Sequence, residues 1–339
     1  MRDRLIVVGA SAGGVEALRA LVTNLPGPLP VPMVVVVHVS ASARSSLPAI
    51  LARDGRIPVV HATQGQQLAR GTIHVAPPDH HVLVHDGHLR LSRGPRVNHH
   101  RPAIDPLFMS AARAVGRRAI SVLLSGVLDD GTSGTGSIRD AGGTTIAQSP
   151  EDALFDAMPL NAIEQVGVDH VLPAAEIAAR LVALVEEPVS RAVDDDDVPE
   201  DAVALAPVSS DIERELARER TENLSGASGY ACPDCHGSLW ELHDGGVARF
   251  RCRVGHSFGG ESLLASMSEH LEKALWAGYR ALVESAALAQ RLEERSQIRG
   301  LVMLADRYRR NNVDARARAE TLRSVLEHGQ LVTGLNTDE

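Results

Sequence analysis

Three polar side chains follow three apolar runs that have the character of buried strands. Ser11 follows "LIVVGA", His38 follows "MVVVV", and Asp130 lies shortly after "ISVLLSG". A serine, a histidine and an aspartate are the groups that acyl transfer needs as nucleophile, as base and as the carboxylate that orients the base. Because the carboxyl ends of parallel strands meet at one edge of a sheet, we expect the three side chains to converge there.

The turn "GASAGG" around Ser11 allows three interpretations. The spacing G-x-S-x-G is typical of a nucleophile on a sharp strand-to-helix turn, with the backbone N–H of Ala12 facing a developing oxyanion. The glycines also approximate the fingerprint of a dinucleotide-binding oxidoreductase, but the second strand would then end in Asp or Glu instead of His38. In the third interpretation the serine only caps the following helix.

The elements that must position these residues alternate between strand-like and helix-like segments throughout 1–187. Continuous apolar strands in this rhythm predict an α/β fold, with a doubly wound, mainly parallel sheet covered by helices on both faces. Short β-like runs around an Asp-Gly turn within 72–92 predict a hairpin or an antiparallel edge. The chain order Ser11, His38, Asp130 excludes the α/β-hydrolase fold, whose order is serine, acid, histidine.

Six motifs appear in order within residues 4–187: "GASAGGVEAL", "VVVHV", "IHVAPPDHH", "HRPAIDPLF", "VLLSGVLDDGTSG" and "TIAQSPEDALFDAMP". Through them the segment resembles the catalytic domain of the CheB family of chemotaxis protein-glutamate methylesterases. The resemblance implies a serine esterase that hydrolyses glutamate γ-methyl esters on a methylated chemoreceptor-like protein, and in some members deamidates glutamine, without a cofactor for catalysis. The alternative is a non-catalytic signalling scaffold that binds receptor helices; it would be expected to lack a member of the triad, and none is lost.

Position by position, the resemblance implies roles for individual residues. Ser11 is the nucleophile, His38 the general base and acid, and Asp130 the orienting carboxylate. The backbone N–H groups of Ala12 and Val127 are the implied oxyanion donors.

The segment departs from the family pattern at the turn that carries Asp130. The family usually has G-M-G-x-D-G, whereas this chain has "GVLDDG" from 126 to 131. Leu128 replaces a glycine there, which would reshape the turn if φ is positive. Asp129 is a neighbouring carboxylate that could serve in place of Asp130. The catalytic segment begins at Leu5 without the family's usual receiver domain before it, so we expect no switching by a receiver of its own.

A second cluster of chemically competent residues lies within 230–260. The spacing Cys232-x2-Cys235-x16-Cys252-x3-His256 supplies four ligands at two knuckles and predicts a structural zinc site in a zinc ribbon. A redox-active CxxC pair is the other interpretation, and His236 is an alternative ligand. The layout resembles the zinc-ribbon-and-helix tail of some relatives of the esterase that lack a receiver.

Charge and hydropathy limit the remaining possibilities. The net charge is −9, and acidic residues concentrate in 188–229, which we interpret as a linker. Neither flanking module has the basic excess that binds nucleic acid or an anionic membrane surface. Since no run of about 18 apolar residues and no signal peptide is present, we expect no membrane insertion and a cytoplasmic location.

Residues 261–330 have helical periodicity and predict a helical hairpin or coiled coil. A stripe that includes Leu264, Leu271 and Leu275 could support self-association. The ribbon has no long apolar patch that would dock it over Ser11. We therefore expect residues 1–187 alone to hydrolyse substrate at about the rate of the full chain.

Overall fold

The computed structural model describes residues 4–41, 45–187, 227–244 and 246–328. The chain divides into two compact units, Met1–Leu263 and Leu264–Glu339. The first unit contains the parallel sheet and also the segment that carries the three cysteines. Most of the predicted linker, 188–226, lies outside the described residues.

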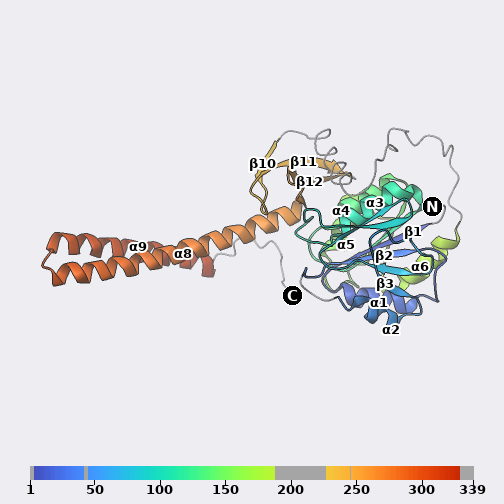
Figure 1. The fold of residues 1–339 in the computed structure, drawn as a ribbon, viewed down its shortest axis with the longest axis horizontal. Coiled ribbons are helices and arrows are strands. Elements are labelled where there is room, and N and C mark those ends of the chain that lie inside the picture. Colours follow the sequence, from blue (N-terminus) through green and yellow to red (C-terminus); the bar gives the residue numbers. More distant parts are fainter. Residues whose placement is uncertain (1–3, 42–44, 188–226, 245, 329–339) are drawn as a thin grey trace. The chain divides into compact units, whose positions relative to one another are not determined.

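The first unit is built on a seven-stranded sheet whose neighbouring strands are all parallel (Figure 1). The strand order is β3-β4-β2-β1-β7-β8-β9, so the winding reverses between β1 and β7. In sheets of this kind ligands bind at the carboxyl ends of the strands near such a reversal. The strands are β1 (Leu5–Ala10), β2 (Met33–Val37), β3 (Val59–His61), β4 (Ile73–Val75), β7 (Ala119–Leu123), β8 (Thr144–Gln148) and β9 (His170–Leu172).

Helices cover both faces of this sheet, which confirms the predicted doubly wound fold. One core joins strand residues such as Val8 to α1 (Gly14–Asn24), α2 (Leu47–Asp54) and α6 (Ala174–Glu186). The other joins Val7 to α3 (Ile104–Val115), α4 (Thr132–Asp140) and α5 (Ala157–Asn161). Successive strand residues face opposite cores, and because both faces are buried the strands are apolar throughout. Short 3-10 and π segments occupy Gly116–Arg118 and Ala162–Val166.

The predicted antiparallel pair is present as a hairpin of β5 (His81–His85) and β6 (His88–Ser92), closed by Asp86 and Gly87. It forms a two-stranded sheet of its own and does not extend the main sheet. The preceding run of the same segment, β4, joins the main sheet in parallel. The main sheet therefore has no antiparallel edge among the described strands.

The cysteine-bearing segment forms a four-stranded antiparallel sheet, hereafter the ribbon. Its strands are β10 (Ala227–Ala231), β11 (Ser238–Asp244), β12 (Val247–Cys252) and β13 (Ser257–Gly259). Helix α8 (Gly260–Ile298) follows β13 without a break.

The second unit contains the rest of α8 and α9 (Val302–His328), which pair as an antiparallel hairpin. The Asn312 side chain donates to the Ala286 carbonyl at 2.8 Å, and Arg309 pairs with Glu293 at 2.8 Å. Leu264 and Leu271 remain exposed within this unit. Among the helices that the structure describes, none is long and apolar enough to span a bilayer.

Candidate active site

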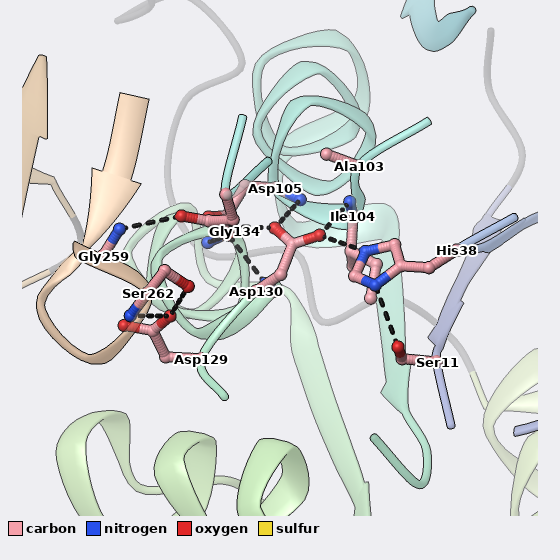
Figure 2. A network of polar contacts seen from close by, with 12 residues as sticks. Ser11, His38, Ala103, Ile104, Asp105, Asp129, Asp130, Gly134, Gly259 and Ser262 are labelled. Atoms are coloured by element: carbon pink, nitrogen blue, oxygen red, sulfur yellow. Dashed lines mark hydrogen bonds and ion pairs between the residues drawn. The ribbon is translucent and has the colours of Figure 1, made fainter. Parts of the chain in front are cut away.

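The three side chains singled out in the sequence lie together where the winding of the sheet reverses. Ser11 follows β1, His38 follows β2 and Asp130 follows β7, and β1 is the neighbour of both other strands. The Ser11 Oγ lies 2.9 Å from His38 Nδ1, and His38 Nε2 lies 2.6 Å from Asp130 Oδ2 (Figure 2). A continuous path of hydrogen bonds thus links the hydroxyl to the carboxylate.

The His38 ring presents Nδ1 to the serine and Nε2 to the aspartate, the reverse of the arrangement in chymotrypsin-like proteases. An ionised carboxylate can only accept hydrogen bonds, so the proton resides on Nε2. The Nδ1 lone pair is then free to accept the Ser11 proton. The reversed ring still supplies a neutral imidazole nitrogen as base, but its tautomer carries the proton on Nε2 instead of Nδ1.

The backbone around Ser11 is a tight turn that requires small residues. Its own N–H donates to the Ser125 carbonyl at 2.9 Å, and its carbonyl accepts from the Gly14 N–H at 2.9 Å. Gly13 has φ 68°, and a Cβ there would lie 2.7 Å from Ser125 Oγ, so only glycine fits. The glycines of this turn are therefore explained by backbone geometry.

The loop after β7 passes directly beside Ser11. A Cβ added at Gly126 would lie 2.9 Å from the Ser11 Cβ. Within the described residues, the backbone N–H groups of Ala12 and Val127 donate no hydrogen bond, as oxyanion donors require. Leu128 has φ 63°, so the leucine adopts the left-handed conformation that glycine would occupy without strain.

Asp130 is buried, and its surroundings favour the ionised form. Oδ2 accepts from the Ile104 N–H at 2.7 Å and Oδ1 from the Asp105 N–H at 3.2 Å, so the carboxylate caps α3. Burial alone would raise the pKa of Asp130, but the His38 hydrogen bond and charge and the Ile104 N–H together hold this pKa below its usual value. Asp130 is therefore ionised at neutral pH and fixes the His38 tautomer.

A second buried carboxyl, Asp105, lies beside Asp130. Its Oδ1 accepts from the N–H groups of Gly131 at 3.1 Å and Gly134 at 2.7 Å. Burial and the negative charge of Asp130 raise the pKa of Asp105 to about 7. The Asn98 Nδ2 donates to Asp130 Oδ1 at 2.9 Å and to Asp105 Oδ2 at 3.2 Å, which offsets part of the repulsion between the two acids.

Asp129, the alternative carboxylate, points away from His38. It accepts hydrogen bonds from the backbone N–H groups of Glu261 at 3.1 Å and Ser262 at 3.3 Å, and from the Ser262 hydroxyl (Figure 2). The first turn of α8 therefore contacts the turn that carries Asp130. The ribbon was expected to have no long apolar patch for docking over Ser11, and this contact next to the ribbon is polar.

Three further polar residues surround Ser11, His38 and Asp130, and the sequence alone indicated no role for them: Asn98, His100 and Asp105. The His100 ring stacks on His38, with ring centroids 3.6 Å apart and planes 9° apart. All three lie in or beside the motif "HRPAIDPLF", which contributed only to the resemblance. The sequence signal that could have indicated a functional role for them is their polar character next to the apolar segment that forms α3.

The four expected metal ligands cluster in the ribbon. The ligand atoms of Cys232, Cys235, Cys252 and His256 all lie within 4.8 Å of one another, so the group could bind a metal ion. The Cys235 and Cys252 sulfurs are 3.6 Å apart, and His256 Nδ1 lies 3.7 and 3.6 Å from the Cys232 and Cys252 sulfurs. A tetrahedral zinc ion requires S–S separations of about 3.8 Å and S–N separations of about 3.5 Å. His236 is not part of this cluster.

Comparison with known proteins agrees with the site. The CheB methylesterase family matches residues 6–181. The chain belongs to this family. It is 41% identical over 180 residues to a protein-glutamate methylesterase/protein-glutamine glutaminase of Anaeromyxobacter dehalogenans, covering 53% of each chain. A putative enzyme of the same description from Leptospira interrogans is 35% identical over 185 residues, which cover 54% of this chain and 96% of the relative.

A solved structure shares the fold of the parallel-sheet segment. The catalytic domain of Thermotoga maritima CheB methylesterase superposes with a TM-score of 0.53 at 32% identity, covering 54% of this chain and all of that domain. The chain spans about half the length of several of its curated relatives, including the one from Anaeromyxobacter. The family match, residues 6–181, covers the parallel-sheet segment and does not reach the ribbon or the helical hairpin.

Proposed function

We propose that this chain is a serine esterase that hydrolyses glutamate γ-methyl esters on the helices of a chemoreceptor-like protein. The observation that carries the proposal is the path of hydrogen bonds from Ser11 through His38 to Asp130. The names of the family relatives, protein-glutamate methylesterase/protein-glutamine glutaminase, support both the ester substrate and deamidation of glutamine by the same site.

The proposed reaction begins when Ser11 Oγ attacks the ester carbonyl and His38 Nδ1 accepts the hydroxyl proton. Asp130 balances the positive charge that develops on the ring. The carbonyl oxygen becomes an oxyanion that accepts hydrogen bonds from the N–H groups of Ala12 and Val127. Its collapse breaks the bond to the methoxy oxygen, which leaves as methanol with the proton from His38.

The acyl-enzyme that remains is an ester between Ser11 and the glutamyl side chain. A water molecule gives its proton to His38 Nδ1 and attacks this ester through the same oxyanion geometry. Collapse returns the proton to Ser11 Oγ and releases the free carboxylic acid of glutamate. With glutamine as substrate the same steps release ammonia instead of methanol.

The test is methanol release from a methylated receptor fragment, with wild-type chain and Ser11→Ala compared at equal concentration. We expect stoichiometric methanol with the wild type and no release above background with Ser11→Ala. Binding of the fragment without any methanol from the wild type would contradict the esterase and favour a non-catalytic scaffold.

For the ribbon we propose a structural zinc ion held by Cys232, Cys235, Cys252 and His256. The separations between their ligand atoms support this choice, and thiolates with one imidazole are a donor set that zinc prefers. The ion would stabilise a segment too small to form a core without it. It has no role in the reaction proposed for Ser11.

For the helical hairpin we propose self-association with a second copy of this chain. The side chains of Leu264, Met267 and Leu271 are 58%, 44% and 49% exposed, which supports an apolar contact surface on α8. Light scattering should give a dimer that Leu264→Ser with Leu271→Ser converts to a monomer; a monomeric wild type would contradict this. The proposed receptor substrate implies that the chain acts in the cytoplasm.

A further inference from the structure

The ribbon is joined to the catalytic segment by its last strand. The Asn98 N–H donates to the Ser257 carbonyl at 2.8 Å, and Val97 and Ser257 form a parallel β-bridge. Phe258 is fully buried, and its ring centroid lies 5.0 Å from that of His99. The strand β13 therefore packs along the same short segment that supplies Asn98 and His100 to the active site.

Asn98 connects this strand to the triad through its side-chain amide. The Gly259 N–H donates to Asn98 Oδ1 at 2.8 Å, while Asn98 Nδ2 donates to Asp130 Oδ1 at 2.9 Å. Only the oxygen of an amide can accept a hydrogen bond, so the Gly259 N–H determines which end of Asn98 faces the carboxylate. A single amide thus links the ribbon to the oxygen of Asp130 that His38 does not contact.

Asp129 makes a second connection, one residue before Asp130. Its buried carboxylate accepts from the first turn of α8 through the Glu261 and Ser262 N–H groups and the Ser262 hydroxyl. Gly259 approaches so closely that an added Cβ would lie 2.1 Å from Asp129 Oδ2. The turn 126–131 is therefore held from the ribbon side by Asp129 and from the His38 side by Asp130.

We propose that the junction of β13 and α8 positions the triad carboxylate through Gly259, Glu261 and Ser262. Asn98 and Asp129 are the positioning residues. The part of this proposal that concerns catalysis rests on the proposed esterase function. A change in the ribbon that withdraws β13 would release the Asn98 amide and the Asp129 carboxylate together. Asp130 Oδ1 would then lose the fixed Asn98 donor and keep only the Asp105 N–H, and Asp130 would also lose the fixed backbone of its own turn. The His38 ring would lose its orientation.

Two adjacent glycines provide the experiment. Gly259→Ala places a methyl group against Asp129, whereas a Cβ at Gly260 would meet no atom within 4 Å, so Gly260→Ala is the matched control. Two quantities are measured on the full chain: methanol release, and the low-field proton NMR resonance of the His38 Nε2–H bonded to Asp130. The resonance is assigned by its loss in His38→Ala, and it does not depend on knowing the substrate.

We expect Gly259→Ala to shift or remove the resonance and to lower kcat about tenfold with KM within about twofold, because the defect lies in positioning and not in substrate binding. Gly260→Ala should match the wild type in both. Metal content and circular dichroism verify folding. If Gly259→Ala does not fold, Ser262→Ala replaces it, because this variant removes one hydroxyl donor to Asp129. Ser262→Ala should change the resonance and kcat in the same direction by a smaller amount.

A folded Gly259→Ala chain with the wild-type resonance and kcat would overturn the proposal. If Gly259→Ala does not fold, a folded Ser262→Ala chain with the wild-type resonance and kcat would overturn it. If the wild type releases no methanol, the esterase function fails, while a resonance that still moves in Gly259→Ala and not in Gly260→Ala would support the positioning role. The two failures are therefore distinguishable.

Discussion

The imidazole rings of His38 and His100 are stacked, with centroids 3.6 Å apart and an angle of 9° between the planes. Two positively charged rings at this distance would repel one another. Burial, together with the positive charge on His38, lowers the pKa of His100 to about 4. His100 therefore stays neutral at neutral pH and presents an uncharged aromatic face to His38, the proposed acceptor of the Ser11 proton.

This neutral state of His100 predicts a pH dependence of stability. The folded pKa of about 4 lies below the reference value of 6.5, so the folded chain binds fewer protons than the unfolded chain between these values. Stability therefore falls as the pH drops through this range, and His100→Phe should reduce the loss between pH 7 and pH 5 by about 2 kcal/mol. Urea denaturation at the two pH values measures the effect.

The control for this measurement is His88→Phe, at an exposed histidine on β6. His88→Phe should leave the difference in unfolding free energy between pH 7 and pH 5 as large as in the wild type. His81, whose pKa burial also lowers to about 4, contributes in the same direction and remains in both variants. An unchanged difference in His100→Phe would show that His100 does not stay neutral in the folded chain.

The two consecutive carboxylates predict unequal effects on turnover. Asp130→Asn should lower kcat by about a thousandfold or more, because the amide no longer fixes the His38 tautomer. Asp129→Asn should lower kcat by no more than about tenfold, because Asp129 contacts the first turn of α8 and not His38. Methanol release measured on both variants gives the comparison, and a greater loss in Asp129→Asn would mean that the wrong carboxylate is assigned to the triad.

The positive φ of Leu128 leads to a prediction about the relative stability of two variants at this position. At φ 63° a residue with a Cβ is strained, and glycine is not. Leu128→Gly should therefore be more stable than Leu128→Ala by about 1 kcal/mol, since both variants lose the same leucine side chain and only glycine relieves the strain. Urea denaturation of the two variants provides the measurement. Alanine equal to or above glycine would place this residue outside the left-handed region.

Much of the fold and the triad could be predicted from the sequence because each rests on local patterns. Apolar runs that end in Ser11 and His38 indicate parallel strands, and parallel strands bring their carboxyl ends to one edge. The strand that ends before Asp130 could be located in the same way. The strained backbone conformation of Leu128 could also be anticipated, because the residue stands where the family has glycine.

The contact between the ribbon and the turn at Asp129 could not be predicted in this way. An apolar docking patch would be visible in the sequence, whereas this contact uses main-chain N–H groups, an amide and a buried carboxylate. Polar contacts of this kind depend on atoms that are distant in sequence and have no periodicity. Asn98 and Gly259, which are 161 residues apart, have no sequence pattern in common.

The last prediction concerns the histidine that completes the metal site. The sequence left His236 as an alternative to His256, and the structure groups His256 with the three cysteines. His256→Ala should therefore lower the metal bound per chain well below one equivalent, whereas His236→Ala should retain about one. Elemental analysis of both variants, purified without chelator, measures the difference.

Cys252→Ser serves as the positive control in the same experiment, because its thiolate lies within reach of both Cys235 and His256. It should lose the metal as His256→Ala does. Retention of a full equivalent of zinc by His256→Ala together with its loss from His236→Ala would reverse the assignment. A wild-type chain that is folded and free of metal would contradict the site itself, because the ribbon would then hold its strands together without an ion.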